Sequence, residues 1–260
     1  MTELARYYAR NRIRGSIYLA AAMSVLAALV IWVYPSFSEA FDDELLEAYP
    51  DAMLQAFDIR TMESLEGFLA FELYIFGWVI LLGLYLAYAA AGTIADDVDR
   101  GRTDILLSMP LSRARFVLES FVSLAVPILV VNVVTPVVVY VAAELIDEPM
   151  AAMDLIAVHA LSIPYLFACA AIGLLASVAV DRAAIAQRLS LGIVFGLFMV
   201  ESLLDGTDYE AVGALTPMRY YDPNEILLEG TYDLVGATML VLATIGLLVV
   251  SQLWFRRRDI

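Results

Sequence analysis

The sequence predicts an all-α, polytopic membrane protein with six transmembrane helices, and its composition and hydropathy carry this prediction. Of the 260 residues, 62% are hydrophobic, well above the roughly half that is usual in soluble domains. The excess falls in apolar runs of about the 20 residues that a helix needs to cross a bilayer core. One transmembrane domain over residues 1–260 is therefore expected, with spans at Ser16–Tyr34, Phe68–Ile94, Phe116–Ala143, Leu155–Val180, Leu189–Leu204 and Leu234–Phe255.

The arginines predict the orientation of these spans. All 15 basic residues are arginine, and every one except Arg60 and Arg219 falls on the inner side if both termini lie inside. An excess of basic residues marks the cytoplasmic side of a membrane protein. We therefore expect a multi-pass protein of the plasma membrane with both termini in the cytoplasm.

Residues 1–15 are predicted to form an interfacial helix ahead of the first span. Arg6, Arg10 and Arg14 recur every four residues, and Tyr7 and Tyr8 lie elsewhere on the helix. Basic side chains can face anionic headgroups while tyrosine rings sit at the membrane boundary. A frayed basic end that only fixes the topology is the alternative.

The charge balance limits the classes of partner. The 30 acidic residues give a net charge of −15, whereas nucleic-acid binding needs clustered cations, so no nucleic-acid partner is expected. An acid-rich chain without lysine indicates a host with a high-salt cytoplasm. With one histidine and one cysteine in the chain, no metal site is expected.

A polar stretch, residues 95–115, separates the second and third spans. It begins with acidic residues, turns at Gly101, continues with the apolar Ile105–Leu107 and reaches Pro110. Glycine permits a sharp turn, and proline disfavours helix in the residue before it. We therefore expect one or two helical turns, Asp104–Met109, to lie across the end of a helical hairpin as a docking surface.

This stretch resembles the cytoplasmic signature of ABC-2 type transporter permeases. The shared pattern is acid-acid-x-acid-Arg-Gly, a Leu-rich triplet and Pro-x-Ser-Arg, and the chain end from Tyr220–Pro223 to Arg256–Arg258 resembles haloarchaeal members. The chain departs from many members at Arg102, where they have threonine, and at Glu119–Ser120, where they have Gly-Lys. The resemblance implies an ABC-2 (type V exporter-like) permease fold in which residues 95–115 form the coupling segment that sits on the ATPase. The residues so assigned to ATPase coupling are Asp96, Asp97, Asp99, Arg100, Gly101, Arg102, Asp104, Ile105, Leu106, Leu107, Pro110, Ser112 and Arg113.

The resemblance also implies a function and partners. The chain would be the membrane-spanning permease subunit of an ATP-driven exporter, with ATP and Mg on a separate ABC ATPase subunit, and with no enzyme activity and no cofactor of its own. A second permease chain, in a homodimer, and membrane lipids are the other expected partners. Two alternatives stay open, namely a non-transporting mechanotransmitter or scaffold of the ABC type and an intramembrane enzyme.

Polar residues within the spans are the remaining candidates. Asn132 and Pro136 in the third span are candidates for lining a cavity, with ordinary helix packing as the alternative. Glu72, His159 and Glu201 are ionisable, which inside a membrane suggests function. The two glutamates lie near the outer boundary, where we expect solvated carboxylates rather than a proton relay. His159 has no nucleophile or second ligand at a spacing typical of a catalytic site.

The fifth predicted span is short, at about 16 residues, and the moderately apolar Ala211–Leu215 follows it. An undersized span before a broken apolar piece is compatible with a re-entrant segment, because protein can bury non-helical backbone at membrane depth. The resemblance implies such an element on the outer side before the last span, and a plain connecting loop is the alternative.

Overall fold

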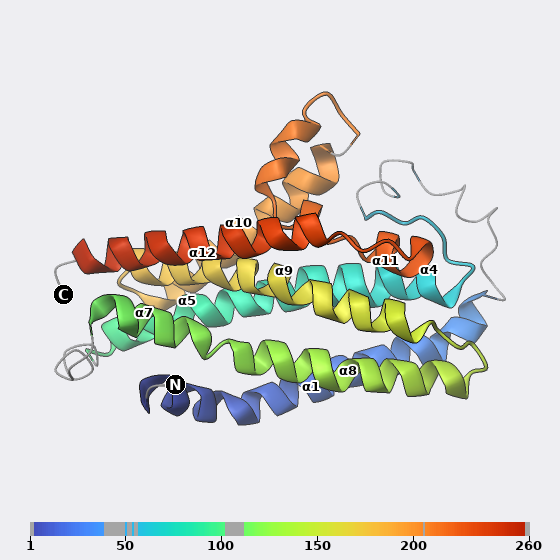
Figure 1. The fold of residues 1–260 in the computed structure, drawn as a ribbon, viewed down its shortest axis with the longest axis horizontal. Helices are drawn as coiled ribbons and strands as arrows, with labels where there is room; N and C mark the ends of the chain where they lie inside the picture. The colour runs from blue at the N-terminus through green and yellow to red at the C-terminus, as the bar shows by residue number, and fades with distance from the viewer. Residues whose placement is uncertain are drawn as a thin grey trace.

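The six predicted spans are confirmed as helices. The computed structural model describes residues 3–38, 50, 54, 57–101, 112–204 and 206–257. Six helical stretches in these residues are long and apolar enough to cross a membrane, and most lie side by side along the length of the molecule (Figure 1). They are Leu4–Ser38, Leu65–Asp99, Arg113–Leu145, Ala152–Ala179, Ala183–Leu204 and Leu234–Arg257.

These stretches are built from shorter elements, and the second span changes its helix type along its length. Its middle section, η1, is a π-helix, and the pieces on either side are α-helical. The elements in chain order are α1 (Glu3–Ser38), α4 (Leu65–Leu69), η1 (Ala70–Leu82), α5 (Gly83–Asp99), α7 (Arg113–Val122), α8 (Ala125–Leu145), α9 (Ala152–Ala179), α10 (Ala183–Leu204), the 3₁₀-helices η2 (Glu210–Leu215) and η3 (Met218–Tyr220), α11 (Pro223–Glu229) and α12 (Leu234–Arg257).

α1 is one continuous helix that packs along α8. The residues predicted to form an interfacial helix are its first turns, so no break separates them from the first span. Their position in the membrane interface stays a prediction.

α9 lies at the centre of the bundle and contacts α5, α8, α10 and α12. Its approach to α5 is close enough that a Cβ at Gly173 would overlap the carbonyl oxygen of Ala87. The hydroxyl of Ser177 accepts hydrogen bonds from the backbone N–H groups of Ile94 and Ala95, at 3.0 and 2.9 Å. Small residues allow membrane helices to pack backbone against backbone, so this seam fixes the end of α5 to α9.

The fifth span is longer than predicted. α10 has 22 residues and begins at Ala183, because Ala183–Arg188 is rich in good helix formers that continue the helix beyond the apolar run. The prediction of an undersized span was therefore wrong. The end of α10 and the 3₁₀-helix η2 stand away from the bundle, and the chain returns to it at η3, which contacts α12 (Figure 1). A broken helical segment thus precedes α12, and its depth in the membrane stays a prediction.

Candidate functional site

The predicted coupling segment emerges at the end of the bundle where α1 begins and α12 ends, which we call the termini end (Figure 1). α5 ends at this end of the bundle, and α7 begins there. α7 is fastened to α12, since the side-chain amide of Gln252 donates to the carbonyl of Ala114 at 3.0 Å and the rings of Phe116 and Phe255 stack at 5.8 Å. Both sides of the segment are thus anchored to long helices.

The N-terminal turns of α1 are bound to the end of α5 through a buried carboxylate. The hydroxyl of Tyr8 donates to the carboxylate of Asp97 at 2.5 Å, and Asp97 is only 5% exposed. Asp97 is among the residues predicted from the sequence to contact the ATPase. The structure places its side chain inside this chain, where it holds α1 against α5.

α1 is also bound to α7, through Glu119. One carboxylate oxygen of Glu119 accepts the backbone N–H of Ala5 at 3.1 Å, and the other accepts the guanidinium of Arg115 at 2.9 Å. The first N–H groups of a helix have no partner within the helix and favour a negative charge nearby. Sequence reasoning missed this role of Glu119, because its partner Ala5 is distant in the sequence.

Arg12 links the same helices one turn further along α1. Its guanidinium donates to the hydroxyl of Ser123 at 3.0 Å and to that of Thr93 at 2.8 Å. The hydroxyl of Ser123 in turn donates to the carbonyl of Ser120 at 2.6 Å. Three polar side chains, from α1, α5 and the end of α7, therefore meet where these helices pack together.

The coupling residues that the structure describes flank the segment. Asp96 and Arg100 form an ion pair at 2.8 Å on the last turn of α5, with Asp99 and Arg100 exposed. Gly101 has φ of +63°, a conformation that favours glycine and turns the chain out of the helix. At the far side Ser112 caps α7 by accepting the backbone N–H of Arg115, and Arg113 donates to the carbonyl of Phe255. Outside the described residues lie Arg102, Asp104, Ile105, Leu106, Leu107 and Pro110.

The two residues predicted to line a cavity, Asn132 and Pro136, both lie on α8. Asn132 is buried between α8 and α9, where it accepts the hydroxyl of Ser162 at 2.9 Å and donates to the carbonyl of Ile128 at 2.9 Å. Both ends of its amide are thus used inside the chain. Pro136, one turn further along α8, is partly exposed. The geometry at Asn132 supports the packing alternative.

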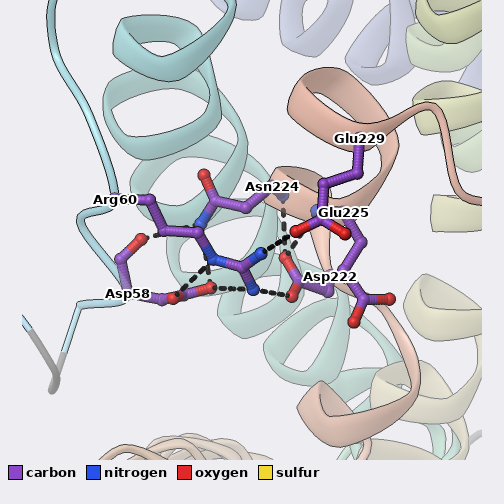
Figure 2. Close-up of polar contacts among 6 residues, drawn as sticks. All are labelled: Asp58, Arg60, Asp222, Asn224, Glu225 and Glu229. Carbon is purple, nitrogen blue, oxygen red and sulfur yellow. Dashed lines mark hydrogen bonds and ion pairs between the residues drawn. The ribbon is translucent and has the colours of Figure 1, made fainter.

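A polar cluster lies at the opposite end of the bundle, which we call the far end (Figure 2). The guanidinium of Arg60 forms ion pairs with Asp58 at 3.1 Å, Asp222 at 2.6 Å and Glu229 at 2.8 Å. The side-chain amide of Asn224 donates to both the carbonyl and the carboxylate of Asp58, at 2.7 and 2.8 Å. Residues more than 160 positions apart are thereby joined, and the cluster ties the segment before α4 to α11.

Asp222 is the most constrained member of this far-end cluster. Its carboxylate caps α11 by accepting the backbone N–H groups of Asn224 and Glu225, at 2.7 and 3.3 Å. Burial raises the pKa of Asp222 to about 6, and the Asp58 carboxylate adds to this, while Arg60 and the two N–H groups act in the opposite direction. A hollow of about 300 Å³ adjoins the cluster, and Arg60, Asp222, Glu225, Glu201 and Arg219 are among the residues that line it.

Glu201 lines that hollow, and the prediction that its carboxylate is solvated was wrong. It is 8% exposed rather than solvated, accepts the hydroxyl of Thr216 at 2.6 Å and lies 3.5 Å from the guanidinium of Arg219. The partners come from the segment after α10, which folds back over the carboxylate and removes it from water. Glu72, the other predicted interfacial carboxylate, is partly exposed.

The residues considered for an intramembrane enzyme do not form a catalytic arrangement. His159 is buried against the rings of Tyr74 and Trp78, with centroids at 5.4 and 5.1 Å, and its Nδ1 lies 2.9 Å from the carbonyl of Leu155. Cys169 is a buried free thiol. Within the described ranges, no three His, Cys, Asp or Glu side chains are placed to hold a metal ion.

The fold and the termini end together define a multi-pass membrane protein in which a hydrophilic segment is held between two spanning hairpin helices. The family model described as ABC-2 family transporter protein matches residues 5–260, so the chain belongs to that family. The family supplies membrane transport components, which normally work with an ABC ATPase, and the chain is accordingly a transport permease. A search of curated proteins gave no match to the chain.

Proposed function

We propose that this chain is the permease half of an ATP-driven exporter and that it passes the energy of ATP hydrolysis from a separate ABC ATPase chain to a substrate in the membrane. The observation that carries the proposal is that the two helices flanking the coupling segment are bound to α1, α5 through Asp97 and α7 through Glu119. A partner that moves the segment would therefore move these helices together. ATP and Mg would bind to the ATPase.

The docking contact is assigned to Asp104–Met109, with Leu106 and Leu107 as its anchors. Buried apolar anchors usually dominate an interface, and truncating one costs about 2 kcal/mol or more. Arg100 is exposed and already paired within α5, so its contribution is expected to be about 1 kcal/mol or less. The apolar residues should therefore matter more than the charges.

Co-purification tests this assignment. A tagged permease is isolated from host membranes and the recovered ABC ATPase is scored against permease yield. Single aspartate substitutions from Ile105 to Met109 should include at least one that lowers recovery about 30-fold, the equivalent of about 2 kcal/mol, while Arg100→Ala lowers it only a few-fold. Undiminished recovery across all five positions would exclude this segment as the docking element.

The termini end is assigned to the cytoplasm from the arginine asymmetry. On a Cys169→Ala background, a cysteine replacing Ser108 should react with an impermeant reagent only after the cells are opened. A cysteine replacing the exposed Asp208, in the segment after α10, should react in intact cells. Labelling of the first variant in intact cells would overturn the orientation.

The working unit is proposed to be a homodimer of permeases with two ATPases, since closed two-fold assemblies are the commonest oligomers. The mass of the solubilised complex should show two copies of this chain, and one copy per ATPase pair would refute the homodimer. The lysine-free composition supports a haloarchaeal host. In sealed vesicles, ATP hydrolysis without movement of any cargo would favour the non-transporting mechanotransmitter instead.

A further inference from the structure

A groove at the termini end lies between α9 and α12, on the side of the bundle away from the coupling contacts to α1. It has a volume of about 540 Å³ and is lined by Ala179, Val250, Leu253, Trp254 and Arg257. Four of these side chains are apolar or aromatic, and the fifth carries a positive charge. α9 and α12 contact one another and run side by side (Figure 1).

The apolar wall of the groove is exposed on the surface of the bundle. Trp254 is 56% exposed and Leu253 is 48% exposed. The surface continues along α12 through Val249, Ile245 and Leu242, which are also exposed. A hydrocarbon chain in the bilayer can therefore enter the groove without crossing a polar barrier. Tryptophan is enriched at the membrane boundary, which is the expected depth of the last turn of α12.

Two neighbouring arginines lie at one end of the groove, where Arg257 lines it and Arg256 stands beside Arg257 on α12. Arg256 and Arg257 form the last turn of α12, both are exposed, and neither forms an ion pair with any residue that the structure describes. A third arginine, Arg182, is exposed just after α9 ends, next to Asp181. Guanidinium groups match the geometry of phosphate oxygens through paired hydrogen bonds. Basic pockets between membrane helices on the cytoplasmic side bind anionic headgroups.

We propose that this groove binds one anionic phospholipid, with an acyl chain against Val250, Leu253 and Trp254 and its phosphate on Arg256 and Arg257. The combination of an apolar channel that is continuous with the lipid-facing surface and a cationic end at headgroup depth fits an amphiphile with a negative head. Two uncompensated charges favour an anionic headgroup over a zwitterionic one, because a zwitterion brings its own cation to the same place.

Native mass spectrometry of the purified permease tests this site. The protein is titrated in detergent with phosphatidylglycerol or with phosphatidylcholine of the same acyl chains, and the first bound lipid is quantified. The Arg256→Gln, Arg257→Gln double variant should bind phosphatidylglycerol roughly 30-fold more weakly than the wild type, as expected for losing two cations near a membrane surface. Its binding of phosphatidylcholine should be unchanged.

Arg10→Gln is the matched control, because Arg10 is an exposed arginine at the termini end on α1 and does not line the groove. It should leave phosphatidylglycerol binding within about twofold of the wild type. Equal wild-type affinities for the two lipids, or equal losses in the control and the double variant, would overturn the proposal. An unchanged elution profile and unfolding temperature establish that the double variant is folded.

Two other occupants would give different results. If the ATPase covers this groove, the double variant loses ATPase recovery and keeps its affinity for phosphatidylglycerol. If a second copy of the permease covers it, the variant loses dimer mass and again keeps the lipid affinity. Either result rejects the lipid site. Leu253→Asp supplies a second arm, because a carboxylate in the apolar wall should remove phosphatidylglycerol binding while both arginines remain.

Discussion

Asp222→Asn should make the stability of the protein less dependent on pH. In the wild type, burial and the Asp58 carboxylate raise the pKa of Asp222 to about 6, against about 3.9 for an exposed aspartate. A raised pKa means that the folded protein holds the proton more tightly than the unfolded chain does. The contribution of Asp222 to stability is therefore greatest below about pH 4 and is lost as the pH rises through about 6.

The size of the effect follows from the difference between the two pKa values. That difference is about 2, and each unit of pKa corresponds to about 1.4 kcal/mol, which gives an upper value of about 3 kcal/mol. The side chain of Asp222 remains 26% exposed, so solvent screening reduces the expected change to about 1–2 kcal/mol. Asparagine keeps an oxygen that can cap α11, so the substitution removes the charge without removing the cap.

The assay is thermal unfolding in detergent at pH 7.5 and pH 5. The wild type should gain stability on going to pH 5 by about 0.5–1 kcal/mol more than Asp222→Asn does, which is about half of the full effect because pH 5 still lies above the pKa of the unfolded chain. Glu229→Gln is the control, because Glu229 pairs with the same Arg60 but is 56% exposed, and its pH dependence should match the wild type. The same pH dependence in the wild type and Asp222→Asn would refute the reasoning.

Two further substitutions test the packing of the bundle. Tyr8→Phe removes a hydrogen bond to the buried carboxylate of Asp97 and should lower the free energy of unfolding by about 1.5–3 kcal/mol. Tyr7→Phe, which changes an exposed ring, should leave the free energy of unfolding unchanged. Equal effects of the two substitutions would show that the hydrogen bond is unimportant. Gly173→Ala forces a methyl group into the backbone of α5 and should cost about 3 kcal/mol in the same unfolding assay, the upper end for an overfilled core. Gly192→Ala, where nothing lies within 4 Å, should be neutral or slightly stabilising, and a harmless Gly173→Ala would contradict the close approach of α5 and α9.

Hydropathy located the six spans because the requirement that the membrane imposes can be read from each short stretch of sequence by itself. Each helix needs a run of apolar residues, and such runs were present in the right number. The start of α10 was missed for the same reason, since Ala183–Arg188 is helical but too polar to count as membrane-spanning. Hydropathy detects only the apolar part of a helix, whereas the helix itself extends as far as its backbone hydrogen bonds do.

The polar residues were harder to place, because their partners are distant in the sequence. Asp97 is held by Tyr8, which is 89 positions away, and Glu119 is held by a backbone group 114 positions away. Glu201 is covered by Thr216 from a segment whose path the hydropathy pattern leaves open. A carboxylate near a span boundary has the same local sequence whether it is solvated or bonded, so only the assembled bundle distinguishes the two cases.

These long-range hydrogen bonds determine which helices would move together if the coupling segment were displaced. Asp97 and Glu119 bind α1 to α5 and α7, and Ser177 binds the end of α5 to α9, which itself packs against α12. Breaking any one of these contacts removes a hydrogen bond from a buried polar group, which costs about 1 kcal/mol or more. Under the proposed coupling, a displacement of residues 95–115 is therefore cheaper to accommodate as a joint movement of the helices than as a local deformation of the segment. The far end is tied by the ion pairs of Arg60, whose partners range from partly buried to exposed, and by the buried amide of Asn224, which donates to Asp58. Both ends of the bundle are therefore held by contacts between segments that are distant in the sequence.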